Sequence, residues 1–134
     1  LFSTLLGARL STVSDIESYK KQNKEKFDEL VSVSDESIKL TNELADKFEQ
    51  ASKLRLNDKY KEYLILKSQE FRKRAEADKL VAPITKLFLE TKDTDIWNKE
   101  IDDYNKKSEN IMKEAEEIEK KADKIVEENP TLIK

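Results

Sequence analysis

The sequence predicts an all-α fold, an elongated antiparallel three-helix bundle of the coiled-coil type, with room for a short fourth helix at the N-terminus. Five helix-favouring residue types (Ala, Glu, Lys, Leu and Arg) make up half of the 134 residues. Apolar residues recur at alternating spacings of three and four along much of the chain. Only one Gly and two Pro interrupt the pattern. Together these features are typical of long, continuous helices.

Composition also excludes several kinds of site. With a single Gly, the chain has no glycine-rich phosphate loop or dinucleotide fingerprint. It has no Cys and no His, so disulfides, zinc–thiolate sites and histidine catalysis are excluded. The net charge of −3 gives the whole molecule no drive toward nucleic acid or an anionic membrane.

Residues 1–23 are expected to form an N-terminal extension or a short amphipathic helix that begins near Thr12. Its first part, LFSTLLGARLSTVS, contains no acidic residue. Three interpretations remain open: a remnant of an acid-poor targeting sequence, the end of a membrane anchor that precedes Leu1, or apolar turns that pack on the bundle or on a neighbour. The compartment is therefore unknown, and the acid-poor segment favours a processed organellar or membrane-tethered protein.

The first long helix is predicted over residues 24–55. Its seam steps by three and four residues, and its middle layers, Ser34, Ser37 and Thr41, are small and polar. Such layers weaken a core but can fix its register. Nothing apolar lies between Tyr19 and Phe27, so an upstream helix there must be solvated or must bend.

The second helix is predicted over residues 58–90, after a turn at Asn57-Asp58. Pro83 lacks an N–H group and should kink or restart this helix between Asp78 and Ala82. Around it lies an apolar belt that we predict to be a protein-interaction surface or else to be buried in the bundle: Leu80, Val81, Pro83, Ile84, Leu87, Phe88 and Leu89.

The third helix is predicted over residues 95–128, with Thr94 or Asp95 as its N-cap and Asn129-Pro130 as its end. Its unbroken seam runs from Trp97 to Ile125. Residues 24–130 would then form the bundle, and residues 131–134 a C-terminal tail. Short connections make neighbouring helices antiparallel. Residues 58–92 carry a net charge of +3 and residues 93–128 a net charge of −6, which favours their pairing.

Three groups of charged residues are candidate sites. The acidic cluster near Asp93 fails the calcium-loop pattern, because the sixth position, Asn98, is not Gly. Glu70 and Asp78 come closest to an inward face, yet a surface position on a kinked helix is the favoured interpretation. The basic run Arg72-Lys73-Arg74 is interrupted by acids, so we expect it to pair with an acidic protein or with the third helix rather than with nucleic acid.

The absence of catalytic groups and cofactor motifs predicts a protein that is not an enzyme and binds no cofactor or metal. We expect a structural or interaction module, an accessory, spacer or adaptor subunit that uses the apolar belt to bind a protein partner or a second copy. The alternative is an extracytoplasmic ligand-sensing bundle tethered by an anchor upstream of Leu1. In that case Ser34, Ser37 and Thr41, with Asp78 or Arg74, would line the pocket.

Overall fold

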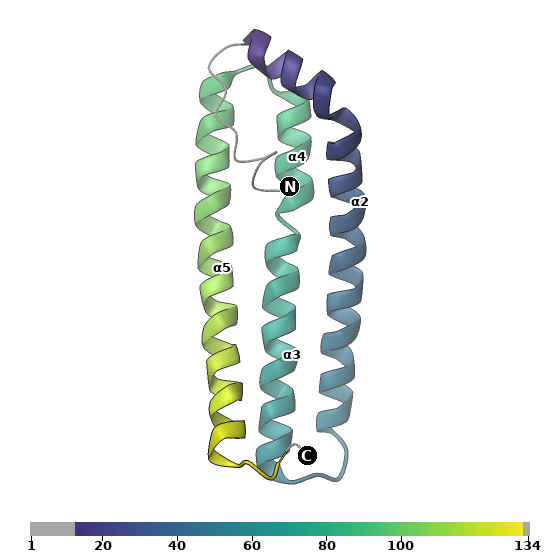
Figure 1. Cartoon of the computed structure of the whole chain (residues 1–134), viewed down its shortest axis with the longest axis vertical. Helices are drawn as coiled ribbons and strands as arrows, with labels where there is room; N and C mark the ends of the chain where they lie inside the picture. The colour runs from purple at the N-terminus through teal and green to yellow at the C-terminus, as the bar shows by residue number, and fades with distance from the viewer. Residues whose placement is uncertain (1–12, 133–134) are drawn as a thin grey trace.

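The computed structural model describes residues 13–132, and the predicted all-α bundle is confirmed. Its helices are α2 (Val13–Ser52), α3 (Asp58–Asp78), α4 (Val81–Glu90) and α5 (Thr94–Glu128). Helices α3 and α4 lie end to end and run opposite to α2 and α5 (Figure 1). The earlier part of the chain, residues 1–12, with most of the acid-poor segment, lies outside the described residues.

Local hydrogen bonds explain where α3 and α5 begin. The side chain of Asn57 accepts a 2.8 Å hydrogen bond from the N–H of Lys59 at the start of α3. The Asp93 carboxylate accepts hydrogen bonds from the N–H groups of Asp95 and Ile96, at 2.9 and 3.2 Å. The N-cap of α5 is therefore Asp93, and our expectation of Thr94 or Asp95 is wrong by one or two positions. Each cap satisfies N–H groups that have no partner within the helix.

The predicted break near Pro83 is confirmed, and it separates α3 from α4 at Lys79 and Leu80. Pro83 lies in the first turn of α4, where its missing N–H costs least. In a continuous helix, however, its ring would clash with the carbonyl of Lys79. The chain instead closes α3 with bonds from the N–H of Lys79 to Ala75 and from that of Leu80 to Ala77.

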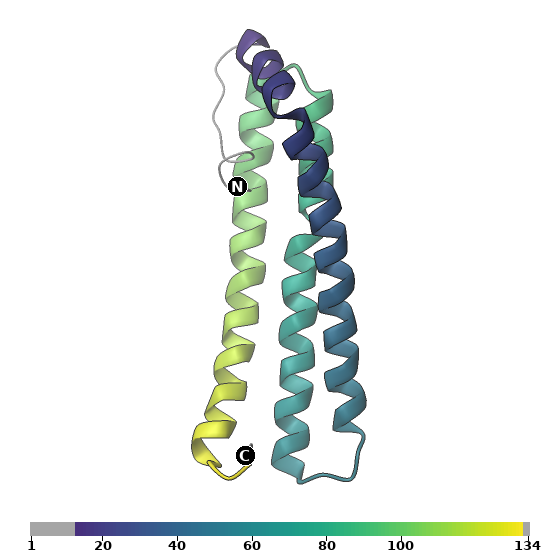
Figure 2. The same ribbon diagram turned by 45° about the vertical axis from the view of Figure 1, so that its right-hand side comes forward.

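Helix α2 continues through the charged stretch that follows Tyr19, so no helix end separates residues 13–23 from the residues that follow them. Its first turns lean across the end of the bundle, over the connection between α4 and α5 (Figures 1 and 2). There the Lys20 ammonium donates to the carbonyls of Leu89 and Thr91, at 3.0 and 2.7 Å. The solvated stretch therefore bends, which lets α2 cover the top of α4.

The densest part of the core lies under this cover. It joins α2, α4 and α5 through one cluster of buried side chains: Phe27, Ile84, Phe88, Trp97, Ile101 and Tyr104. The ring centroids of Phe88 and Trp97 are 4.5 Å apart, and those of Phe27 and Phe88 are 4.8 Å apart. Below the break, the buried apolar residues are mostly alanines, such as Ala45, Ala75 and Ala115.

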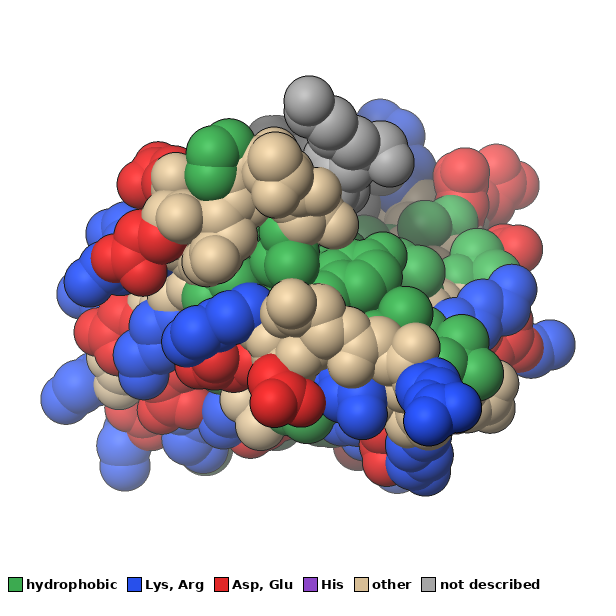
Figure 3. Space-filling model, turned by 90° about the horizontal axis from the view of Figure 1, so that it is seen from below, with side chains coloured by type: hydrophobic (Ala, Val, Ile, Leu, Met, Phe, Trp, Pro, Cys, Tyr) green, Lys and Arg blue, Asp and Glu red, His purple; other side chains and the backbone are tan. Residues whose placement is uncertain are grey.

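Helix α3 packs along both α2 and α5, whereas α2 and α5 make only marginal contact with each other. The lower half of the molecule is therefore two pairwise helix contacts rather than a three-sided core. Seen from that end, hydrophobic side chains form a central band with charged side chains on its flanks (Figure 3). Near the break, residues of α2 and α5, with the end of α3 and the start of α4 between them, line an open hollow, which we call the groove between α2 and α5.

Phe88 is the residue on which we expect the upper core to depend. Phe88→Ala should lower the free energy of unfolding by about 3–5 kcal/mol, because a fully buried ring is replaced by a cavity. Urea unfolding followed by circular dichroism measures the change. The neighbouring Leu89 is 38% exposed, so Leu89→Ala should cost less than about 1 kcal/mol. Equal losses in the two variants would contradict this description of the core.

Candidate functional site

Most of the apolar belt on α4 is buried inside the fold. Val81, Ile84 and Phe88 are buried, and Leu80 and Leu87 pack half-buried against the core cluster. Pro83 and Leu89 are exposed. Leu80, Pro83 and Leu87 line a small hollow of about 140 Å³ beside α5. Docking of a protein through this belt stays a prediction, and the surface left for it is small.

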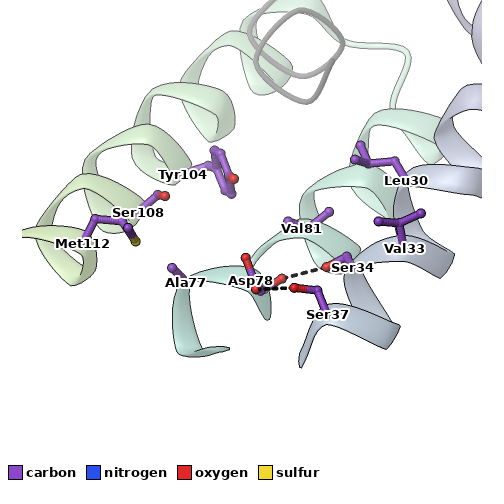
Figure 4. A pocket seen from close by; sticks show the side chains of 10 residues that line it. All are labelled: Leu30, Val33, Ser34, Ser37, Ala77, Asp78, Val81, Tyr104, Ser108 and Met112. Carbon is purple, nitrogen blue, oxygen red and sulfur yellow. Dashed lines mark hydrogen bonds between the residues drawn. The ribbon is translucent and has the colours of Figure 1, made fainter. Parts of the chain in front are cut away.

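A larger cavity opens where the groove passes the break between α3 and α4. Its volume is about 320 Å³, near the lower end of the range for small-molecule sites. Helix α2 forms one wall and α5 the other, with the end of α3 and the start of α4 between them (Figure 4). The lining residues are Leu30, Val33, Ser34, Ser37, Ala77, Asp78, Val81, Tyr104, Ser108 and Met112.

Asp78 is the central polar group of this cavity, and two serines of α2 hold it. The Ser37 hydroxyl donates to Oδ2 of Asp78 at 3.0 Å, and the Ser34 hydroxyl donates to the Asp78 backbone carbonyl at 3.0 Å. That carbonyl is one of the last four of α3, which have no partner within the helix. The helix break therefore creates the acceptor that Ser34 satisfies, and it fixes the Asp78 carboxylate between the two walls.

Tyr104 and Ser108 of α5 face Asp78 across the cavity (Figure 4). Burial raises the pKa of Tyr104 to about 12; a hydrogen bond with Ser108 opposes this rise, and the negative charge of Asp78 adds to it. The phenol is therefore neutral over the whole physiological range. The cavity combines an apolar lining, several hydroxyl groups and one carboxylate, and no basic side chain lines it.

The pocket that we predicted for a ligand-sensing bundle is assembled in part. The structure brings Ser34, Ser37 and Asp78 together, but Thr41 and Arg74 do not line the cavity. The sequence pattern identifies Tyr104 and Ser108 of α5 only as members of the apolar seam. Their hydroxyl groups, like those of Ser34 and Ser37 on α2, are the feature of the sequence that could have indicated a polar cavity.

Glu70 is 2% exposed, so the interpretation of this residue as a surface position is wrong. Its carboxylate pairs with Lys67 and accepts a 3.0 Å hydrogen bond from Arg74. Arg74 also donates to Glu119 of α5 at 3.0 Å. Removal of one member would leave a buried charge without its partner, which is costly, so this network fixes how α3 lies against α5.

The rest of the basic run pairs with both neighbouring helices, whereas within the bundle we expected pairing with the third helix alone. Lys73 pairs with Glu114 of α5 at 2.7 Å. Arg72 reaches the other neighbour and pairs with Asp46 and Glu49 of α2, at 2.8 and 2.6 Å. These exposed pairs contribute little energy each, so their effect is to favour one arrangement of α3 between its neighbours.

Two further kinds of site are absent from the part of the chain that the structure describes. No cluster of three or more acidic side chains there is arranged to hold a metal ion. None of the described helices combines the length and hydropathy needed to cross a membrane. The acidic residues that precede Trp97 serve instead to start α5.

Comparison with known proteins gives no relative: no family profile, curated protein or solved structure matches the chain.

The raised pKa of Tyr104 predicts how stability depends on pH. The folded state holds the phenol proton up to about pH 12, whereas an ordinary tyrosine releases it near pH 10. The resulting stabilisation is fully present below pH 10 and is lost as the pH rises through about 12. Urea unfolding between these values should show wild type losing roughly 2–3 kcal/mol relative to Tyr104→Phe. Parallel pH profiles for the two proteins would contradict the assignment.

Proposed function

We propose that this protein is a non-enzymatic interaction module whose groove between α2 and α5 receives a basic amphipathic helix of a partner protein. The observation that carries the proposal is an apolar stripe on α2. Val33, Leu40 and Leu44 are 56%, 55% and 39% exposed. Their spacings of seven and four residues place them on one face of the helix. Burial of this face needs another apolar surface.

The stripe faces the groove and not the opposite side of the bundle. Val33 lines the cavity together with Leu30 and Ser37, which lie on the same side of α2. Asp46 and Glu49, which pair with Arg72, lie on another side of the helix. From Val33 to Leu44 the stripe is about 16 Å long, or three helical turns. This length suits a docked helix.

On the other side of the groove, acidic residues of α5 favour a partner helix that carries positive charge. Four exposed acidic residues recur every seven positions along α5: Asp102, Glu109, Glu116 and Asp123. By helix geometry, this row lies beside Ser108 and Met112, which line the cavity. Because α2 and α5 run in the same direction, Glu109 and Glu116 are level with the apolar stripe, and Glu109 also pairs with Lys113 on the surface of α5 at 3.0 Å. A partner helix with an apolar face and a Lys/Arg edge would complement both walls.

The ligand-sensing bundle remains the second candidate. It is supported by the meeting of Ser34, Ser37 and Asp78 with Tyr104 in one cavity. The membrane tether of that candidate concerns sequence upstream of Leu1 and stays a prediction.

A designed peptide tests the helix-docking proposal. A helix of about 18 residues, with leucine on one face and lysine on the other, should bind the full chain in a fluorescence-anisotropy titration. Leu40→Lys should weaken binding by about tenfold or more, because it places a cation in the apolar stripe. Ile65 is 45% exposed on α3, and Ile65→Lys is the matched control that should leave binding unchanged. A peptide with glutamate in place of lysine should bind far less.

Three outcomes would overturn the proposal. They are no binding of the lysine peptide, equal binding by Leu40→Lys, and equal binding of the glutamate peptide. Sedimentation of the unliganded protein completes the test. A dimer that dissociates on Leu40→Lys but not on Ile65→Lys would show that the occupant is a second copy and not a partner protein.

A further inference from the structure

We propose that the cavity at the break between α3 and α4 binds a primary ammonium group carried on a short apolar stem. The proposal adds a ligand chemistry to the groove. A small alkylamine could supply this group, and that source does not depend on the proposed function. A lysine of a docked helix could also supply it, and that source rests on the proposed function.

The charge of the lining selects for a cation. Asp78 is the one carboxylate among the lining residues, and no Lys or Arg accompanies it there. The nearest arginine one turn earlier in α3, Arg74, is engaged by Glu70 and Glu119. Because no described basic side chain pairs with Asp78, a bound cation would supply its missing counter-charge. An anionic ligand would be repelled.

The hydrogen-bonding groups also suit an ammonium. The hydroxyl group of Ser37 donates its hydrogen to the carboxylate of Asp78, and that of Ser34 donates to the Asp78 carbonyl. They therefore present lone pairs to the cavity, as does the second carboxylate oxygen of Asp78. An ammonium brings three N–H donors and no acceptor, which matches a set of acceptors. Charge-assisted bonds of this kind are stronger than those that a neutral alcohol would form.

The remaining surface of the cavity is apolar and sets the size of the stem. Leu30, Val33, Val81 and Met112 surround the polar groups on both walls (Figure 4). A volume of about 320 Å³ limits the ligand to a small molecule or a single side chain. The ammonium would lie against Asp78, and the stem would cover the apolar side chains.

A comparison of two probes of equal length tests the ammonium preference. Hexylamine, which is protonated at neutral pH, and the uncharged 1-hexanol are titrated into the full chain, and amide chemical shifts are followed by NMR. We expect saturable shifts centred on Ser37, Asp78 and Ser108, with hexylamine binding about tenfold or more tightly than hexanol. Equal affinities, or shifts spread over the surface, would overturn the proposal.

Two variants test whether the Asp78 carboxylate causes the preference for an ammonium group over a hydroxyl group. Asp78→Asn keeps an oxygen that can accept from Ser37, and it should lower hexylamine affinity about tenfold while hexanol affinity stays the same. The control Asp35→Asn makes the same charge change at an exposed position on another face of α2. It should leave hexylamine affinity within about twofold. Unchanged hexylamine binding by Asp78→Asn would overturn the assignment.

A third variant keeps the test valid if Asp78→Asn does not fold. Val33 is 56% exposed, so Val33→Trp should be tolerated, and its indole should obstruct the cavity and abolish the binding of both probes. Retained hexylamine binding would show that the amine lies elsewhere and would overturn the proposal.

Leu40→Lys separates this inference from helix docking. Leu40 does not line the cavity, so hexylamine binding should survive in a variant that no longer binds the peptide. Loss of both would show that the amine needs the apolar stripe and would overturn the proposed site. In wild type, displacement of hexylamine by the lysine peptide identifies a lysine side chain as a source, and simultaneous binding identifies a small amine.

Discussion

The ring of Pro83, which would clash with the carbonyl of Lys79 in a continuous helix, is the constraint on which the rest of this structure depends. It ends α3 at Asp78 and restarts the chain as α4 at Val81. One consequence lies above the break, where α4 turns its apolar residues toward Phe27 and Trp97. The other lies at the break, where a helix-end carbonyl and a carboxylate meet the serines of α2. The upper core and the cavity therefore have the same physical origin.

The size of the buried side chains divides the molecule into two halves. Above the break, aromatic rings fill the space between helices and hold α2, α4 and α5 together. Below it, most of the buried apolar residues are alanines, such as Ala45, Ala75 and Ala122. Small side chains let α3 approach each neighbour closely, but they cannot bridge a wider gap. This difference leaves α2 and α5 apart and exposes the stripe that contains Leu40 and Leu44.

Ion pairs between the helices then fix the position of α3 between α2 and α5. Arg72 binds acids of α2, while Lys73 and Arg74 bind acids of α5, so α3 is held between its neighbours by adjacent residues. The acids of α5 that these cations do not engage lie on its exposed faces. At the cavity, α2 contributes Leu30 and Val33, α5 contributes Met112, and Asp78 is the one carboxylate, which is why the proposed amine is basic and partly apolar.

The sequence by itself determined the helices, the break at Pro83 and the pairing of oppositely charged segments, because spacing, missing donors and net charge act locally or along one helix. It also identified Ser34, Ser37 and Asp78 as members of one possible pocket. Only the tertiary structure decided that Glu70 is buried, that most of the α4 belt is covered, and that Tyr104 and Ser108 complete the cavity. Those outcomes depend on how far apart α2 and α5 lie, and side chains on three different helices set that distance together.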